Sequence, residues 1–131
     1  MSQKRSLKNL EEGLPNGFHD AKIKKIDIDY EKHFLVLELS IDVSNMDTNL
    51  PEYRVGKIII SEFLFCVIAQ PDVSSINEVP WISGSDQINP EDLPMRLPDQ
   101  LPEGTFVHRF FINNWNAFLY VVATDAQFEW S

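Results

Sequence analysis

The segment KIKKIDIDYEKHFLVLELSIDV, residues 22–43, decides the fold class of this chain. The apolar positions of its second half are Leu35, Leu37, Leu39, Ile41 and Val43. Polar side chains fill the alternate positions 38, 40 and 42. A period of two residues is typical of a strand that buries one face and leaves the other in water. With the polar turn at residues 31–33, the segment predicts an antiparallel β-hairpin.

The first half of this segment has a change of parity. Its apolar residues fall at position 23 and then at 26, 28 and 30. One extra residue on one strand of a pair produces such a shift, so we expect a β-bulge near Lys24 and Lys25.

A short helix is expected before the hairpin, over residues 6–14. Ser6 is a good N-cap residue, and Gly13 stands near the helix end. The side chains that would share one side of this helix are Leu7, Leu10 and Leu14.

The chain after the hairpin contains further strand signals. Residues 58–60 and 63–69 are apolar almost without alternation, which suits strands covered on both faces. Ser61 and Glu62 interrupt this run, as either a hairpin turn or a bulge in one long bent strand. Residues 105–112 and 117–124 predict a second hairpin with an Asn-rich turn, and residues 127–130 predict a short edge strand.

Residues 71–104 differ in composition from the rest of the chain. They hold six of the eight prolines and seven acidic residues, with only Arg96 to oppose them. Proline cannot donate to a strand ladder, so we predict a long loop with a short 3₁₀ or helical turn beginning at Asn89. Loops of this length in small domains often carry function, which makes Glu91 and Asp92 candidate binding residues.

Together these elements predict a mainly β fold in one domain, residues 1–131. We expect an antiparallel β-sandwich or partly open barrel of about six to eight strands with a short N-terminal helix. An α+β arrangement is the alternative.

Composition limits the classes of function. The chain has 131 residues, 44% of them hydrophobic, and a formal net charge of -9. Residues 33–131 carry four basic and fourteen acidic side chains, which argues against nucleic-acid binding and favours a basic protein partner. No long apolar segment predicts a membrane span or secretory signal, so we expect a cytoplasmic protein with Cys66 buried and unreactive. An open antiparallel sheet has edges that must be covered or charged, so a C2 dimer is compatible with the sequence.

No recognised catalytic, metal or nucleotide signature is present. The chain lacks a phosphate-binding glycine loop, HExxH, CxxC and GxSxG, and we expect no cofactor and no enzymatic activity. His19 and Asp20 are the most suggestive pair, since an imidazole beside a carboxylate can transfer protons or bind a metal. Neighbours on a strand point to opposite faces, however, so we favour a structural role for them, with His108 and Asp125 as the only helpers available. His108 itself lies among apolar residues of its strand and is expected to be a hydrogen-bonded core histidine.

Trp115 raises the hypothesis of a ligand that stacks on its ring, with Asn114 and Asn116 supplying amide groups. An indole that covers the end of a β-core is the more frequent arrangement, and we favour it.

The elements GFHDA (residues 17–21), IDIDY (26–30) and LVLEL (35–39) resemble the start of several small bacterial β-rich families with a GxHDA-type N-terminal element. The resemblance implies a β-rich fold, and similarity to some immunity proteins of polymorphic toxins. It implies no catalytic residues.

The leading functional hypothesis is therefore a non-enzymatic protein interaction module, such as an immunity protein that neutralises a toxin. A small-ligand or carbohydrate-binding β-module at Trp115 is the second hypothesis, and an enzyme that uses His19 and Asp20 is the third.

Overall fold

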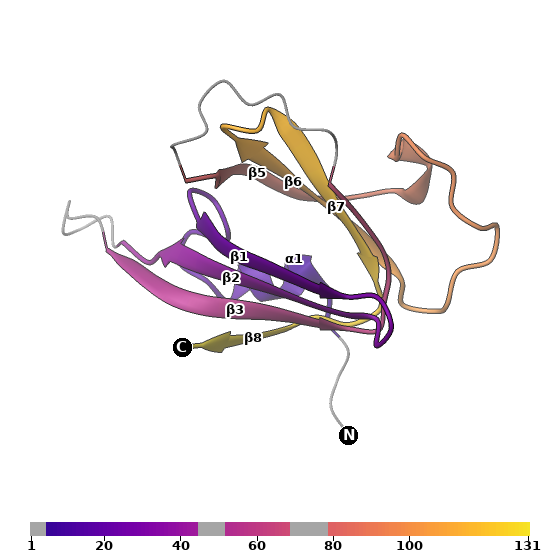
Figure 1. Ribbon diagram of the computed structural model, residues 1–131, viewed down its shortest axis with the longest axis horizontal. Helices are drawn as coiled ribbons and strands as arrows, with labels where there is room; N and C mark the ends of the chain where they lie inside the picture. The colour runs from indigo at the N-terminus through magenta and orange to yellow at the C-terminus, as the bar shows by residue number, and fades with distance from the viewer. Residues whose placement is uncertain (1–4, 45–51, 69–78) are drawn as a thin grey trace.

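The computed structural model describes residues 5–44, 52–68 and 79–131 of the chain. Within these residues it contains one α-helix, one 3₁₀ turn and eight β-strands (Figure 1). The elements in chain order are α1 (Leu7–Glu12), β1 (Lys22–Asp29), β2 (Phe34–Asp42), β3 (Tyr53–Ser61), β4 (Phe63–Ile68), β5 (Trp81–Ile88), η1 (Pro90–Asp92), β6 (Phe106–Asn113), β7 (Ala117–Ala123) and β8 (Gln127–Trp130). The predicted mainly β fold with a short N-terminal helix is confirmed.

All eight strands belong to one open antiparallel sheet in the order β4-β7-β6-β5-β1-β2-β3-β8. The ladder between β1 and β5 consists of the single pair Lys22 and Trp81. At this narrow joint the sheet bends, and its two halves face one another as the layers of a sandwich do (Figure 1). A single folded sheet thus produces the layered arrangement that the strand pattern predicted.

The main core fills the space between the two halves. Helix α1 contacts both β5 and β8, one from each half, and buries Leu7 and Leu10 there. Ser6 caps the helix as predicted: its hydroxyl accepts from the backbone N–H of Asn9 at 3.2 Å, while the Asn9 side chain accepts from the backbone N–H of Ser6 at 3.1 Å. The largest fully buried side chains from the strands and the preceding turn are Phe18, Phe110, Leu35, Leu37, Leu39, Ile41, Ile58, Ile60, Ile82, Ile112 and Leu119.

The first hairpin is present, with the predicted bulge. The pairing of β1 with β2 shifts between Ile23 and Lys25, which places the bulge where the parity of the sequence changes. Strand β8 pairs with β3 at the sheet edge, as expected for residues 127–130.

The break at Ser61 and Glu62 is a corner. Glu62 has a φ of 60°, and the strands on its two sides do not pair: β3 lies between β2 and β8, whereas β4 pairs with β7 at the opposite edge. The chain therefore passes from one half of the sheet to the other, which excludes the hairpin alternative and agrees with a bend.

The prediction of an unbroken loop over residues 71–104 was wrong for residues 81–88. These form β5, which pairs with β6 from Trp81 opposite Asn113 to Ile88 opposite Val107. A register shift between Ile82 and Gly84 interrupts the alternation of the strand, and Ser, Gly and Asp have low strand propensity, so local sequence gives little sign of it. Residues 71–78 lie outside the described residues.

The remaining part of that loop, residues 89–104, is irregular apart from the predicted 3₁₀ turn η1, and we call it the acidic arm. It projects from one end of the folded sheet (Figure 1). A second hydrophobic cluster joins the arm to the outer face of β6 and β7; its buried members are Leu93, Val107, Tyr120 and Val122. Strand β7 is consequently covered on both faces, by the main core and by the arm, which explains a run of apolar residues without alternation.

Candidate functional site

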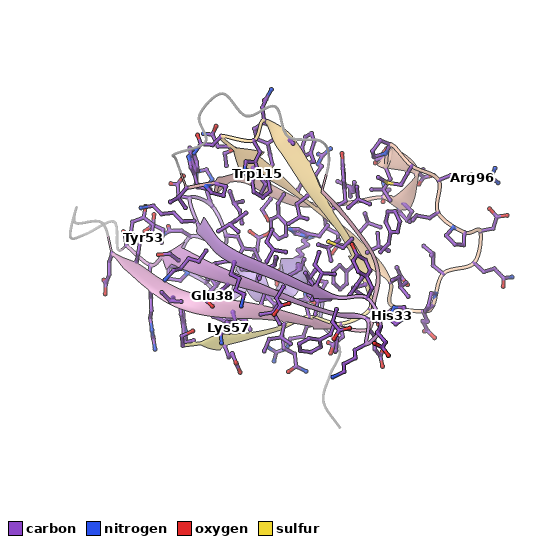
Figure 2. All side chains as sticks on the ribbon, viewed as in Figure 1. His33, Glu38, Tyr53, Lys57, Arg96 and Trp115 are labelled. Carbon is purple, nitrogen blue, oxygen red and sulfur yellow. The ribbon has the colours of Figure 1, made fainter. Side chains whose placement is uncertain are left out.

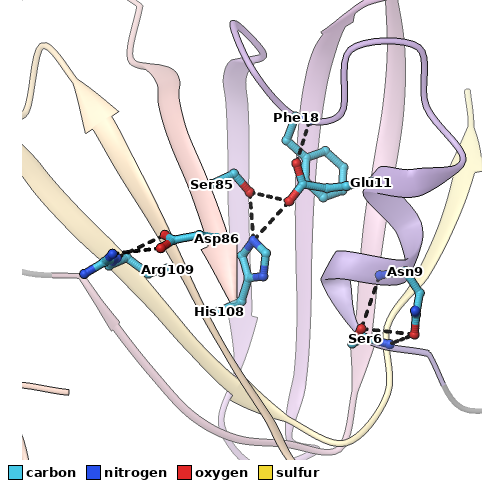
Figure 3. A network of polar contacts seen from close by, with 8 residues as sticks. All are labelled: Ser6, Asn9, Glu11, Phe18, Ser85, Asp86, His108 and Arg109. Atoms are coloured by element: carbon cyan, nitrogen blue, oxygen red, sulfur yellow. Dashed lines mark hydrogen bonds and ion pairs between the residues drawn. The ribbon is translucent and has the colours of Figure 1, made fainter. Parts of the chain in front are cut away.

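Three polar side chains meet near the C-terminal end of α1: those of Glu11, Ser85 and His108 (Figure 3). The hydroxyl of Ser85 lies 2.7 Å from Oε1 of Glu11 and 2.7 Å from Nε2 of His108. The same Nε2 lies 3.4 Å from Oε1 of Glu11. The other carboxylate oxygen of Glu11 accepts from the backbone N–H of Phe18 at 3.2 Å. The helix, the turn after it and the paired strands β5 and β6 are thereby tied together.

This network lies largely out of water, and that changes the chemistry of Glu11. The side chain of His108 is completely buried, while that of Glu11 is 21% exposed. Burial by itself would raise the pKa of Glu11, but hydrogen bonds with His108, Ser85 and the Phe18 amide outweigh it and lower the pKa below its ordinary value. The carboxylate is therefore held in its charged form.

The network contains the residue types of a catalytic triad, but not its geometry. In a triad the serine and the acid bond to different nitrogens of the imidazole. Here Ser85 and Glu11 both meet Nε2, and Nδ1 of His108 is buried without a hydrogen-bond partner. With a proton on Nε2, His108 donates to the Ser85 hydroxyl and Ser85 donates to Glu11. With the hydrogen bonds in this direction, the imidazole presents a donor and not a lone pair to the Ser85 hydroxyl, so His108 cannot act as its base. The contacts fit a structural role, in which they hold α1 against the sheet.

His108 agrees with the expected hydrogen-bonded core histidine, whereas sequence reasoning did not find its partners. Glu11 and Ser85 are separated by 74 positions in the chain, and neither belongs to a recognisable motif. The local signal was limited to two adjacent glutamates, Glu11 and Glu12, at the end of a short capped helix.

His19 and Asp20 lie in the turn before β1 rather than on a strand. Asp20 has a φ of 65°, and this backbone places its Oδ1 3.6 Å from Nε2 of His19. The expectation that the two side chains point to opposite faces was wrong because it assumed an extended backbone. Both are well exposed, at 64% and 43%. The expected helpers are engaged elsewhere: His108 in the buried network, and Asp125 as acceptor of the Arg5 backbone N–H at 2.9 Å.

No metal centre is built around this pair in the part of the chain that the structure describes. Within those residues, no three His, Cys, Asp or Glu side chains gather closely enough to hold a metal ion.

Trp115 occupies the predicted turn between β6 and β7. Its ring is half-buried and packs against the main core (Figure 2). Asn114 and Asn116 both have positive φ, at 73° and 49°, which the tight turn requires. The side-chain amide of Asn114 donates to the carbonyl of Val79 at 2.9 Å. Two of the three residues proposed as a ligand platform thus have packing or bonding roles of their own.

A different indole borders a groove. Trp130 on β8 helps line a groove of about 570 Å³ between α1 and the β3–β8 edge. The guanidinium carbon of Arg54 lies 4.6 Å from the centre of the Trp130 ring, so a cation already covers this face of the indole.

The acidic arm presents the other two predicted site residues. Glu91 and Asp92 are exposed on η1, and Asp99 and Glu103 are exposed farther along the arm. Arg96, the one basic residue of the arm, points away from the body of the molecule and lies 3.6 Å from Asp99 (Figure 2). The arm thus shows four carboxylates and one guanidinium to solvent.

Two hollows accompany these charges. One, of about 580 Å³, is lined entirely by residues 90–101 of the arm. The other, of about 510 Å³, lies between arm residues 96–102 and the sheet, where β4 and β7 contribute Leu64, Phe65 and Val122. The arm therefore has charged and apolar surface side by side.

Alternate residues of the arm hold it in place. Leu93 is buried, and Met95 and Leu97 are half-buried against the second cluster, while the residues between them are exposed. A sequence signal for this anchoring was present but not used: the dipeptide Leu-Pro recurs at positions 93, 97 and 101. Regular spacing of a large apolar residue in a Pro-rich loop indicates that one side of the loop is packed.

Comparison with known proteins gives a fold and no activity. No family model matches the chain, and no curated protein matches it. The structure is similar to the crystal structure of an uncharacterised protein from Neisseria gonorrhoeae, with a TM-score of 0.52 and 14% sequence identity, over 86% of this chain and 92% of that chain. Similarity at this identity shows a shared fold. Among the described residues, no helix is long and apolar enough to cross a membrane.

Proposed function

We propose that this protein is a non-enzymatic binding module whose acidic arm holds a basic protein partner. The observation that supports the proposal is the combination of anchoring and exposure in the arm. Leu93 and its neighbours fix the arm on the sheet, so its exposed carboxylates have defined positions before a partner arrives. A surface ordered in advance loses less conformational entropy on binding.

Electrostatics supports the same partner class. The chain has a net charge of -9, and the arm adds a local excess of acidic groups. Such a surface attracts a basic protein at long range and repels nucleic acid and other acidic molecules.

An immunity protein that neutralises a basic bacterial toxin is the specific form of this proposal. It is suggested by the resemblance of residues 17–39 to the N-terminal elements of bacterial β-rich families. The bacterial source of the structural neighbour is compatible with it.

Affinity capture with two charge variants tests the proposal. The arm variant replaces the four exposed arm carboxylates by amides: Glu91→Gln, Asp92→Asn, Asp99→Asn and Glu103→Gln. The control variant does the same at four exposed sites elsewhere: Glu12→Gln, Asp27→Asn, Glu31→Gln and Glu129→Gln. Both variants change the net charge from -9 to -5, so they differ only in the position of the lost charges.

We expect the unmodified protein and the control variant to capture a basic protein whose retention weakens with salt, and the arm variant to lose it. Equal capture by the two variants would show that net charge, and not the arm, determines binding. That result would refute the proposed role of the arm.

A further inference from the structure

Strand β4 lies at one edge of the sheet. Its only strand neighbour among the described residues is β7. The backbone N–H of Phe63, at the start of β4, donates to the carbonyl of His33 at 3.0 Å, and in the described part of the chain no backbone hydrogen bond joins β4 to the arm. An edge strand presents a row of N–H and C=O groups that can pair with another chain.

Few of the features that usually prevent such pairing are present at this edge: the register shift between Phe63 and Phe65 is one, and the strand has six residues. Strand β4 has the sequence FLFCVI, with no charged residue and no proline. The opposite edge strand, β8, is shorter and carries the exposed charge of Glu129. The two edges of one sheet therefore differ in how open they are to an added strand.

A groove accompanies this edge. Leu64 of β4 is 40% exposed and, with Phe65, forms one wall of the 510 Å³ groove whose other wall is the arm. An extended peptide that adds to a sheet edge needs backbone partners and apolar surface for alternate side chains. Strand β4 and this groove supply both.

The net charge of the molecule decides the class of occupant. Arg96 lines the groove but lies 3.6 Å from Asp99, Glu103 is exposed on the same arm, and the chain carries a net charge of -9, so a second copy of this chain would be repelled. We propose that a basic partner adds an extended segment to β4 as a ninth strand, with apolar side chains in the groove beside the arm and lysine or arginine side chains on the other face of the added strand. This inference rests on the proposed function and specifies how the partner binds.

Peptides with selective backbone methylation test strand addition. The probe alternates lysine and valine over about eight residues, enough to span β4. Two further peptides carry N-methyl groups, one on every lysine and the other on every valine. In an added strand, N–H groups of one parity face β4 and those of the other parity face solvent.

Strand addition predicts that one methylated peptide binds at least about tenfold more weakly than the parent, while the other binds as the parent does. On binding the parent peptide, those amides of residues 64–68 that face away from β7 gain protection from hydrogen exchange. The proposal is overturned if the two methylated peptides bind alike, whether strongly or weakly, or if none of the three peptides binds.

Two variants locate the site. Leu64→Lys places a positive charge in the groove and is expected to weaken binding of the parent peptide. Tyr53→Lys is the control and adds the same charge on the other half of the sheet, away from the arm, at a residue that is 42% exposed (Figure 2). This variant should bind the parent peptide as strongly as the unmodified protein does. Equal binding by both variants would place the peptide elsewhere and refute the assignment of β4.

The outcome also separates the two proposals. Loss of partner capture in the arm variant, without a parity effect among the peptides, would leave the proposed function standing and eliminate strand addition. Capture that does not depend on the arm carboxylates would eliminate the proposed function itself.

Discussion

Replacing Glu11 by glutamine tests the buried network of Glu11, Ser85 and His108. The substitution keeps the size of the side chain and removes its charge. At neutral pH the variant is expected to be less stable than the unmodified protein. The difference is expected to disappear in acid, where the unmodified carboxylate is itself neutral.

The magnitude follows from the contacts of the carboxylate. Glu11 accepts from the Phe18 amide and the Ser85 hydroxyl, and it lies within ion-pair distance of His108. A hydrogen bond to a charged group is stronger than a neutral one by about 0.5–1.5 kcal/mol, and partial exposure of Glu11 reduces this difference. We expect a loss of about 2 kcal/mol in the free energy of unfolding, or roughly 8 °C in Tm for a chain of this size.

The pH dependence has a definite sign. Because the pKa of Glu11 is lowered in the folded state, its contribution to stability is fully present above the ordinary value of 4.5 and is lost as the pH falls through the folded pKa. Urea unfolding at several pH values between neutral and acid would measure the difference between the two proteins. It should be constant above pH 4.5 and shrink below it.

Glu12→Gln is the matched control, since this neighbour on α1 is exposed. A double-mutant cycle of Glu11→Gln with Ser85→Ala should give a coupling free energy of about 0.5–2 kcal/mol. The reasoning is refuted if Glu11→Gln and Glu12→Gln have equal effects, or if the loss in Glu11→Gln is the same at every pH.

Three further predictions concern packing and reactivity. Gly56→Ala would place a methyl group 2.4 Å from Cζ of Phe128, so the ring must move and stability should fall by about 1–2 kcal/mol; tryptophan emission would report the disturbance of β8, and unchanged emission and stability would contradict it. Burial raises the pKa of the Cys66 thiol to about 11, so an aromatic disulfide reagent at pH 8 should modify it only after denaturation, and rapid modification of the native protein would show that β4 opens. Leu93→Ala should weaken the anchoring of the arm by about 2–3 kcal/mol and speed proteolysis within residues 89–104. Pro94→Ala, at the exposed neighbouring position, is the control. Equal rates of cleavage in the two variants would count against a packed arm.

Local sequence patterns predicted those elements whose signal lies within one turn or one strand. Ser6 capped the helix, the parity change at residues 23–26 located the bulge, and the alternation in residues 35–43 matched the alternation of buried and half-buried residues along β2. Each of these features depends on neighbours a few positions away, so the residues that determine it are contiguous in the chain.

Strand β5 and the turn at His19 were predicted wrongly for related reasons. In β5, a bulge at Gly84 and polar side chains at Ser85 and Asp86 hide the strand pattern, and pairing with β6 overrides the weak propensity. At Asp20, the backbone has a positive φ and not the extended conformation of a strand. In both cases the deciding interactions lie outside the local window.

The sequence by itself determined the antiparallel β class, the first hairpin with its bulge, the capped helix and the uneven distribution of charge, because periodicity, capping and composition are local or additive properties. Only the tertiary structure decided that β3 and β4 go to opposite halves of one sheet, that Glu11 meets Ser85 and His108, and that the acidic arm packs beside the edge strand β4. Contacts of this kind join segments far apart in the chain. They depend on how the sheet folds over its core, which no short stretch of sequence specifies.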